Sequence, residues 1–254
     1  MSRARLLVVQ HQDDCPPARF ETWLADAGCA LDVRHAGDGD PLPADLADVD
    51  GLLVLGGSPG AYDDAVAPWL PAVRALVVDA ESRGVPTLGI CLGHQLAAVA
   101  LGGSVARDPQ GQTWGLTPVG WTAAAADDPL LAPVVAARPE ARAVHWNNDV
   151  VTRLPAGATM LATGPGARVQ AARLARSVWG VQLHPEADGG VVECWAAAEE
   201  PAHPARGVLG RDVLTAIDDA HDELGATWAP LAASLAHLAA QRAAAALTTA
   251  SGVG

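Results

Sequence analysis

The sequence predicts an α/β fold in which a mostly parallel, open sheet is covered by helices and extended by antiparallel strands. Short apolar runs alternate with longer stretches of helical periodicity from the N-terminus onward. This alternation is typical of parallel sheets with crossover helices. Half of the residues are hydrophobic and only 18% are charged, which excludes a disordered chain.

The first half of the chain predicts a doubly wound series of strands and helices. Phe20, Trp23 and Leu24 recur at helical spacing, and Gly28 follows as a stop signal. Gly84 and Pro86 end a second helix ahead of a short buried strand. The predicted strands are 6–9, 31–34, 52–55 and 87–90, and the predicted helices are 18–27, 69–83 and 92–101.

The second half predicts antiparallel additions to this sheet, followed by helices. After Gly115 the pattern changes to short strands separated by turn signals, which favours antiparallel pairing. The chain becomes helical from Val191 onward, and residues 229–246 are predicted to form its last long helix. The predicted strands of this half are 116–121, 142–145, 150–154, 159–163, 168–172 and 177–182.

Charge and cysteine usage narrow the functional class. The net charge of −13 disfavours binding to phosphate backbones. The four cysteines form no CxxC pair and no Cys/His cluster at metal-ligand spacing, which predicts neither a disulfide scaffold nor a metal site. The first apolar run is too short for a signal peptide, and no later stretch resembles a bilayer span. We therefore expect a cytoplasmic protein without a metal, nucleotide or flavin cofactor and without nucleic-acid or membrane partners.

The strongest local signal is a G-x-C-x-G pattern at residues 89–93, between a buried strand and a helix. A sharp strand-to-helix turn crowds its neighbours, so glycines two before and two after Cys91 let the thiol project from the sheet edge. The N-terminus of the helix favours a thiolate at this position. Cys91 is the candidate nucleophile of such an elbow; the alternative is a structural cysteine on a glycine-flanked turn.

A cysteine nucleophile needs a base, and His184 is the best candidate. It follows an apolar strand and precedes Pro185 and Glu186. Alternate residues of an extended segment point the same way, so Glu186 can accept the imidazole N–H of His184 and leave the other nitrogen for the thiol. A surface His-Pro-Glu turn is the alternative, but a position at the carboxyl end of a strand favours the catalytic interpretation.

The tetrahedral intermediate of acyl transfer needs an oxyanion hole, and Gly56-Gly57 follows a predicted strand directly. Glycine lets backbone N–H groups approach a ligand closely. The expected donors are the N–H groups of Gly57 and of Leu92, the residue after the nucleophile. A phosphate loop is excluded here because that motif needs a lysine and the chain has none.

Together these residues resemble the class I glutamine amidotransferase family, and most closely its GMP-synthase-like free-standing glutaminase domains. The segments LVLGGSPGAYDD, GICLGHQLAA, Gln170-Ala171 and GVQLHPE are similar to successive family blocks in the right order. The helical tail with Trp195, Glu199 and Trp228 is similar too, though less specifically. The resemblance implies a three-layer, flavodoxin-like fold with residues 1–190 as the catalytic domain and 191–254 as a helical C-terminal extension of it.

The resemblance also implies an activity. Cys91 would attack the side-chain amide of L-glutamine, His184 would move protons, Glu186 would orient His184, and water would hydrolyse the γ-glutamyl thioester. Gly56 and Gln95 would lie near the bound substrate, whereas His94 is assigned no chemistry. The ammonia would pass to a separate acceptor synthetase, because no room is left for a synthetase module. The acceptor and the oligomeric state are not predicted.

One departure from the family pattern bears on the substrate. The family block usually reads Trp-His-x-Asp, and here residues 145–149 read HWNND, so that Asn147 replaces the usual histidine. This keeps a γ-glutamyl peptidase or γ-glutamyl amide hydrolase with the same triad as an alternative. A catalytically silent binding or regulatory protein is a second alternative, since a fold does not guarantee activity.

Overall fold

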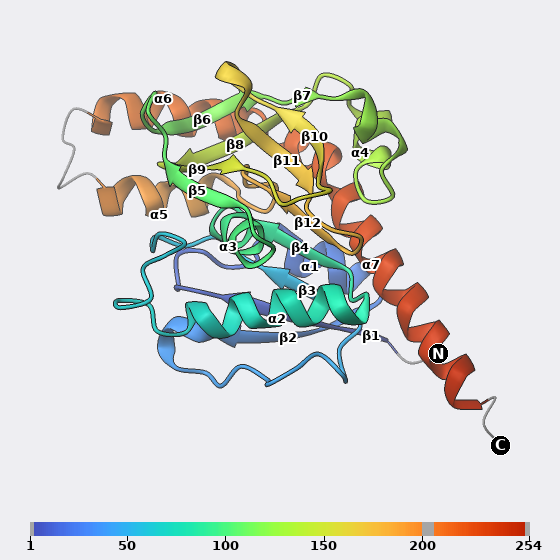
Figure 1. Ribbon diagram of the computed structural model, residues 1–254. Helices are drawn as coiled ribbons and strands as arrows, with labels where there is room; N and C mark the ends of the chain where they lie inside the picture. Colours follow the sequence, from blue (N-terminus) through green and yellow to red (C-terminus); the bar gives the residue numbers. More distant parts are fainter. Residues whose placement is uncertain (1–2, 200–205, 252–254) are drawn as a thin grey trace.

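A computed structural model describes residues 3–199 and 206–251 and has an eight-stranded sheet at its centre (Figure 1). The first five strands in spatial order run parallel, and the last three are antiparallel to their neighbours. In this order the strands are β2 (Cys29–His35), β1 (Ala4–Gln10), β3 (Gly51–Val54), β4 (Thr87–Ile90), β12 (Val178–Val181), β11 (Val169–Arg173), β10 (Thr159–Thr163) and β7 (Gly120–Trp121). The mostly parallel sheet expected from the sequence is confirmed.

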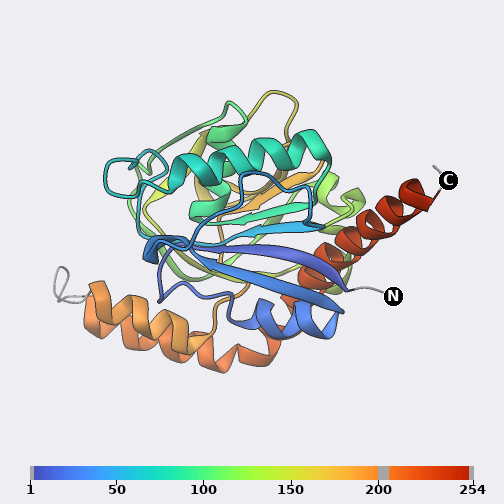
Figure 2. The same cartoon turned by 90° about the horizontal axis from the view of Figure 1, so that it is seen from below.

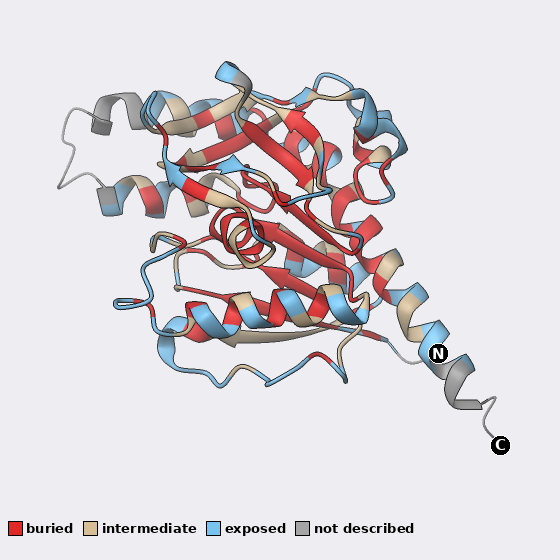
Figure 3. Cartoon of the chain, viewed as in Figure 1, coloured by how far each residue is buried: buried red, intermediate tan, exposed pale blue. Residues whose placement is uncertain are grey.

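Helices cover both faces of this sheet, which explains why its central strands are buried on both sides (Figures 2 and 3). In β1, Leu6 and Val8 join one apolar core, whereas Leu7 and Val9 join the other. One core packs under α2 (Leu70–Arg83) and α3 (Leu92–Ala100). The other packs under α1 (Arg19–Asp26), α4 (Ala132–Ala137), α5 (Gly189–Glu199) and α7 (His221–Ser251).

Two β-ribbons and short helical segments complete the described chain. One ribbon pairs β5 with β9 and the other pairs β6 with β8, both antiparallel. Helix α6 packs against α5 and β6. The bounds are β5 (Ser104–Arg107), β6 (Thr113–Pro118), β8 (Arg142–Asn147), β9 (Asp149–Arg153) and α6 (Arg206–Asp219), with 3₁₀ turns at Ala36–Asp38, Ala123–Asp127 and Pro165–Ala167. None of the helices in the described ranges has the length and apolar composition of a segment that crosses a bilayer.

The structure corrects the sequence prediction in four places. The predicted strands 142–145 and 150–154 form as parts of β8 and β9, but they pair in the two ribbons and do not extend the main sheet. Residues 116–121 are not one strand: β6 ends at Pro118 and pairs in a ribbon, while β7 joins the main sheet. Residues 177–182 contribute β12, which runs parallel to β4 because the chain reverses between β11 and β12. The strand β5 was not expected, since Val105 is its single buried residue.

The last helix is longer than the predicted 229–246, because α7 continues through Pro230. A proline inside a helix removes one backbone hydrogen bond. Trp228 and Leu231, on either side of it, are both buried in the core, and their packing outweighs this cost.

Helices α5, α6 and α7 pack on the sheet domain and its ribbons. The assignment of 191–254 to that domain stays a prediction, and residues 200–205, 252–254 and the side chain of Glu199 lie outside the described part.

We expect Gly120→Ala to destabilise the protein by about 1–3 kcal/mol, the usual cost of overpacking. A Cβ atom on Gly120 would lie 2.5 Å from the backbone oxygen of Thr163, so β7 and β10 would have to separate. Urea unfolding measures the effect. Gly190→Ala is the matched control, because its Cβ would only contact Asp188 at 3.5 Å. Equal stability of the two variants would contradict this account.

Candidate active site

The candidate residues lie at the carboxyl ends of three adjacent parallel strands, where ligands bind in open α/β sheets. Strand β3 leads to Gly56 and Gly57, β4 leads directly to Cys91, and β12 leads to His184. These strands are neighbours in the order β3-β4-β12. The sheet therefore brings together residues that are about ninety positions apart in the chain.

Cys91 stands at a strained turn between β4 and α3. Its φ of 50° and ψ of −104° place it among only two non-glycine residues with positive φ in the described ranges, the other being Ala18. A Cβ on Gly93 would lie 2.1 Å from the backbone oxygen of Val54, and one on Gly89 would lie 2.4 Å from the oxygen of Gly93. Both flanking glycines are thus required by contact, as the sequence pattern predicts.

His184 and Glu186 lie beside Cys91, and all three side chains are buried. The Nδ1 atom of His184 is 2.7 Å from Oε1 of Glu186. The Cys91 side chain also acts on this imidazole and helps to raise its pKa, and since Nδ1 is held by Glu186, Nε2 is the nitrogen that remains for the sulfur. A Cβ on Gly56 would lie 2.9 Å from Cε1 of His184, so glycine is needed for this approach.

Electrostatics favour the charged form of His184. Burial alone would lower its pKa, but the nearby Glu186 and Cys91 outweigh burial and raise the pKa to about 10. Burial lowers the pKa of the neighbouring His145 to about 4, and His184 acts in the same direction. The pKa shifts therefore favour the charged form of the His184 imidazole and the neutral form of the His145 imidazole.

The two residues expected to supply the oxyanion donors lie next to each other. A Cβ on Gly57 would lie 3.0 Å from Cδ2 of Leu92. Within the described ranges neither N–H donates a hydrogen bond to a protein group. The amide of Cys91, by contrast, donates to Val181 at 2.8 Å, and that of Gly93 donates to Leu55 at 3.1 Å. The two N–H groups are thus available to a ligand oxygen.

A chain of side-chain amides ends on the Cys91 sulfur. Gln95 donates from Nε2 to the backbone oxygen of Asp149 at 3.0 Å and to Oε1 of Gln182 at 3.2 Å. Gln182 in turn donates from Nε2 to the Cys91 sulfur at 3.5 Å. Both hydrogens of the Gln95 amide are used, which leaves its carbonyl oxygen for a ligand. Gln182 was not assigned a role from the sequence, although it stands two residues before His184.

Asn147 occupies the position at which the sequence departs from the family pattern. Its Nδ2 donates to the backbone oxygen of Asp149 at 3.1 Å, and its side chain also contacts His145. The residue is buried and lines the cavity described next. Asn147 therefore helps to shape the wall of the site, and its side-chain amide is held by Asp149 rather than by Cys91.

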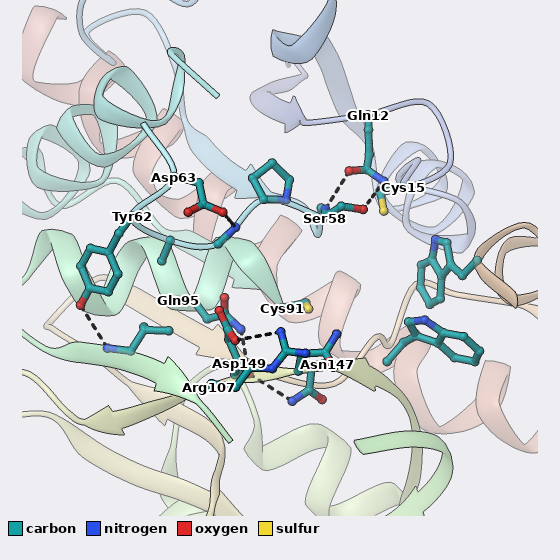
Figure 4. A pocket seen from close by; sticks show the side chains of 18 of the residues that line it. Gln12, Cys15, Ser58, Tyr62, Asp63, Cys91, Gln95, Arg107, Asn147 and Asp149 are labelled. Carbon is teal, nitrogen blue, oxygen red and sulfur yellow. Dashed lines mark hydrogen bonds and ion pairs between the residues drawn. The ribbon is translucent and has the colours of Figure 1, made fainter. Parts of the chain in front are cut away.

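A cavity of about 490 Å³ opens over the Cys91 thiol. Figure 4 shows Cys91 near its middle, with Tyr62 and Arg107 to one side and Gln12 and Cys15 to the other. Burial, followed by the charges of Asp14, Cys91 and Glu186, raises the pKa of Cys15. Cys15 is thus a neutral thiol in the same cavity.

Two tryptophans that the sequence does not connect with the site form one wall of this cavity, called here the tryptophan wall. Trp195, from α5, has its ring centroid 4.6 Å from that of His184. Trp146, from β8, lies 6.2 Å from Trp195. From the sequence, Trp195 belongs only to the tail that resembles the family, because no spacing rule links residue 195 to residue 184.

Within the described ranges, the residues that could jointly hold a metal ion are Asp13, His35 and Asp38. Asp13 and Asp38 are exposed, and none of the three lines the cavity. Exposed acidic groups are common without a bound ion. Because this cluster lies outside the cavity, we assign it no part in the chemistry of Cys91.

The family assignment follows from comparison with known proteins. A family model for class I glutamine amidotransferases matches residues 22–193, which include Cys91, His184 and Glu186. The chain belongs to this family. The family resemblance and the enzyme class expected from the sequence motifs are thereby confirmed.

Relatives of this amidotransferase include components of GMP synthases. A glutamine-hydrolysing GMP synthase subunit of Sulfolobus acidocaldarius is 42% identical over 107 residues, which are 42% of this chain and 53% of that protein. The chain thus matches about half the length of that relative. A glutamine amidotransferase-like protein of Salmonella typhimurium is 30% identical over 190 residues, which are 72% of this chain and 75% of that protein.

Solved structures share the fold of this amidotransferase. A glutamine amidotransferase from Thermotoga maritima superposes with a TM-score of 0.80 at 23% identity, covering 93% of this chain and 98% of that one. One from Methylobacillus flagellatus gives a TM-score of 0.78 at 26% identity, covering 93% and 96%. The three-layer fold is therefore that of the family.

The raised pKa of His184 predicts a pH-dependent contribution to stability. Its ordinary pKa is 6.5, and in the folded protein it is about 10. The charged imidazole stabilises the fold fully below about pH 6.5, and this stabilisation is lost as the pH rises through about 10. We expect the difference in unfolding free energy between wild type and His184→Gln to shrink across this window by on the order of a few kcal/mol.

Urea unfolding at several pH values between these limits measures that difference. The exposed His237 offers a matched control, because His237→Gln makes the same substitution away from any acidic partner in the described hydrogen bonds. A difference for His184→Gln that stays constant or grows with pH would contradict the assignment of charge to His184.

Proposed function

We propose that this amidotransferase hydrolyses the side-chain amide of L-glutamine with Cys91 as nucleophile, His184 as proton carrier and Glu186 as the group that orients His184. One observation carries the proposal. The Cys91 side chain at a strained elbow lies beside an imidazole whose Nδ1 is 2.7 Å from Glu186 and whose pKa Cys91 helps to raise. Nucleophile, base and orienting carboxylate are the recurring parts of covalent acyl transfer.

In the first step, the Cys91 sulfur attacks the γ-carbon of glutamine. As the sulfur attacks, the thiol gives its proton to the imidazole of His184, whose raised pKa favours this transfer, and the imidazolium then passes the proton to the departing nitrogen, which leaves as ammonia. The sulfur is then bonded to the γ-glutamyl group. In the second step, neutral His184 takes a proton from water, the resulting hydroxide attacks the thioester, and the imidazolium returns the proton to the departing sulfur, so that glutamate and the thiol are released.

Charge develops on the γ-oxygen of the substrate in both steps. The N–H groups of Gly57 and Leu92, which donate to no protein group in the described ranges, are proposed to receive this charge. Donors of this kind are held in place before the reaction, so they cost no reorganisation when the tetrahedral intermediate forms.

The amino-acid end of glutamine is proposed to lie on the polar side of the cavity. The carboxylates of Asp63 and Asp149 converge on Gly60, where a Cβ would lie 3.0 Å and 3.6 Å from their Oδ2 atoms. They suit an α-ammonium group, and Arg107 on the same side suits an α-carboxylate. The carbonyl oxygen of Gln95 is free to accept from the amide of the substrate, and Gly56 keeps space open beside His184.

We also propose that the ammonia is consumed by a separate synthetase. The chain is similar to glutamine-hydrolysing GMP synthase subunits of Sulfolobus acidocaldarius and Halobacterium salinarum, and the identity to the second is 34% over 145 residues. This similarity supports a separate synthetase as the partner. Which acceptor receives the nitrogen is a question for co-purification with candidate synthetases.

We expect Cys91→Ser to reduce glutamine hydrolysis to the background rate while leaving the protein folded. A hydroxyl has nearly the same shape as the thiol but is a far weaker nucleophile at neutral pH. Ammonia release from glutamine measures the reaction. Cys194→Ser is the matched control, since Cys194 is exposed and does not line the cavity. Full activity of Cys91→Ser would refute the assignment.

His184→Ala is expected to lower kcat by about 10² to 10⁴, the usual range for loss of general acid–base help.

An electrophilic glutamine analogue should alkylate Cys91 of the wild type faster than Cys15, Cys29 or Cys194, and mass spectrometry of the labelled peptides reads this out. Equal labelling of all four thiols would instead support a catalytically silent protein.

A further inference from the structure

The wall beside His184 limits what can be attached to the departing nitrogen. In the proposed reaction this nitrogen takes its proton from His184, so it leaves on the side of Cys91 that faces the imidazole. With glutamine the nitrogen carries only hydrogen. A substrate with a substituent on this nitrogen has to place the substituent against the groups that surround His184.

Those groups are aromatic and firmly held. The ring of Trp195 lies 4.6 Å from that of His184, at an angle of 55°. Its indole N–H donates to the backbone oxygen of Asp14 at 2.7 Å, which fixes the ring. Trp146 continues the wall at 6.2 Å from Trp195, and both line the cavity together with Cys15. Rigid aromatic surface of this kind favours apolar and aromatic ligand groups.

The cavity is also larger than a small amino acid requires. Its volume of about 490 Å³ lies in the range of about 300–1,000 Å³ that holds drug-sized ligands. Its polar side, with Asp63, Arg107 and Asp149, suits the amino-acid end of a γ-glutamyl compound. The tryptophan side is then left for whatever the γ-nitrogen carries.

We infer that the site also accepts γ-glutamyl amides of aromatic or apolar primary amines, with the amine against Trp146 and Trp195. This inference rests on the triad of the proposed function and not on the hydrolysis of glutamine itself. The Cys91 sulfur bonds to the γ-carbon, the carbon–nitrogen bond breaks, and the amine leaves with the proton from His184. Water then cleaves the thioester, so that one γ-glutamyl amide and one water give glutamate and one amine.

The test compares three substrates with the purified chain: L-glutamine, γ-glutamyl methylamide and γ-glutamyl benzylamide. Ammonia or amine release gives kcat/KM for each. We expect kcat/KM for the benzylamide to exceed that for the methylamide by about tenfold or more. The benzyl group is larger than the methyl group, and even one extra methylene in an apolar pocket can change kcat/KM by this factor.

Two variants locate the effect on the tryptophan wall. Trp146→Ala removes part of the wall and should lower the benzylamide-to-methylamide ratio by about tenfold. Ala198→Trp should lower the same ratio by filling the space. Ala198 is exposed, lines the cavity and stands one helical turn after Trp195, so this variant is expected to fold. Trp23→Ala, in α1 outside the cavity, is the control that leaves the ratio unchanged.

The outcomes separate this inference from the proposed function. Hydrolysis of glutamine with a methylamide rate equal to or above the benzylamide rate overturns the inference and leaves the proposed function standing. A ratio that neither Trp146→Ala nor Ala198→Trp changes also overturns it. Hydrolysis of the benzylamide without glutamine supports the inference and refutes the glutaminase. No turnover of any substrate, with wild type equal to Cys91→Ser, refutes both.

Discussion

The left-handed backbone at Cys91 is the constraint on which the rest of the site depends. A residue with positive φ at the end of β4 turns the chain so sharply that α3 begins at the next residue. The turn exists only because Gly93 packs on the backbone of Val54 and Gly89 packs on Gly93. Strained backbone of this kind costs on the order of 1–3 kcal/mol and persists when the surrounding structure holds it. Here the neighbouring strands β3 and β12 provide that support.

The same strand order sets the electrostatics of the site. Because β12 lies parallel to β4, both strands end at the same edge of the sheet, and His184 meets the Cys91 thiol there. Glu186 then outweighs the burial of the imidazole and keeps it charged. A surface histidine with the same sequence neighbours would lack this balance, since water would screen the carboxylate.

The C-terminal helices add a wall that the sheet alone does not provide. Trp195 comes from α5, packs on His184 and is fixed through Asp14, which follows β1. Strand ends and helix thus meet around one cavity of about 490 Å³. In the proposed mechanism, the triad supplies the groups that cleave an amide bond. The tryptophan side of the cavity is proposed to select the group that the departing nitrogen carries.

The sequence by itself determined the features that depend on neighbouring residues. The glycine-flanked cysteine, the His-Pro-Glu spacing and the alternation of strands and helices are readable because steric rules and side-chain periodicity act over a few positions. Tertiary structure alone decided the direction of β12, the split of residues 116–121 between two sheets, and the contacts of Gln182, Cys15 and Trp195 with the site. Each of these depends on which distant segments pair and pack. Pairing is a property of the whole set of strands and of the cores they bury, so no local pattern contains it.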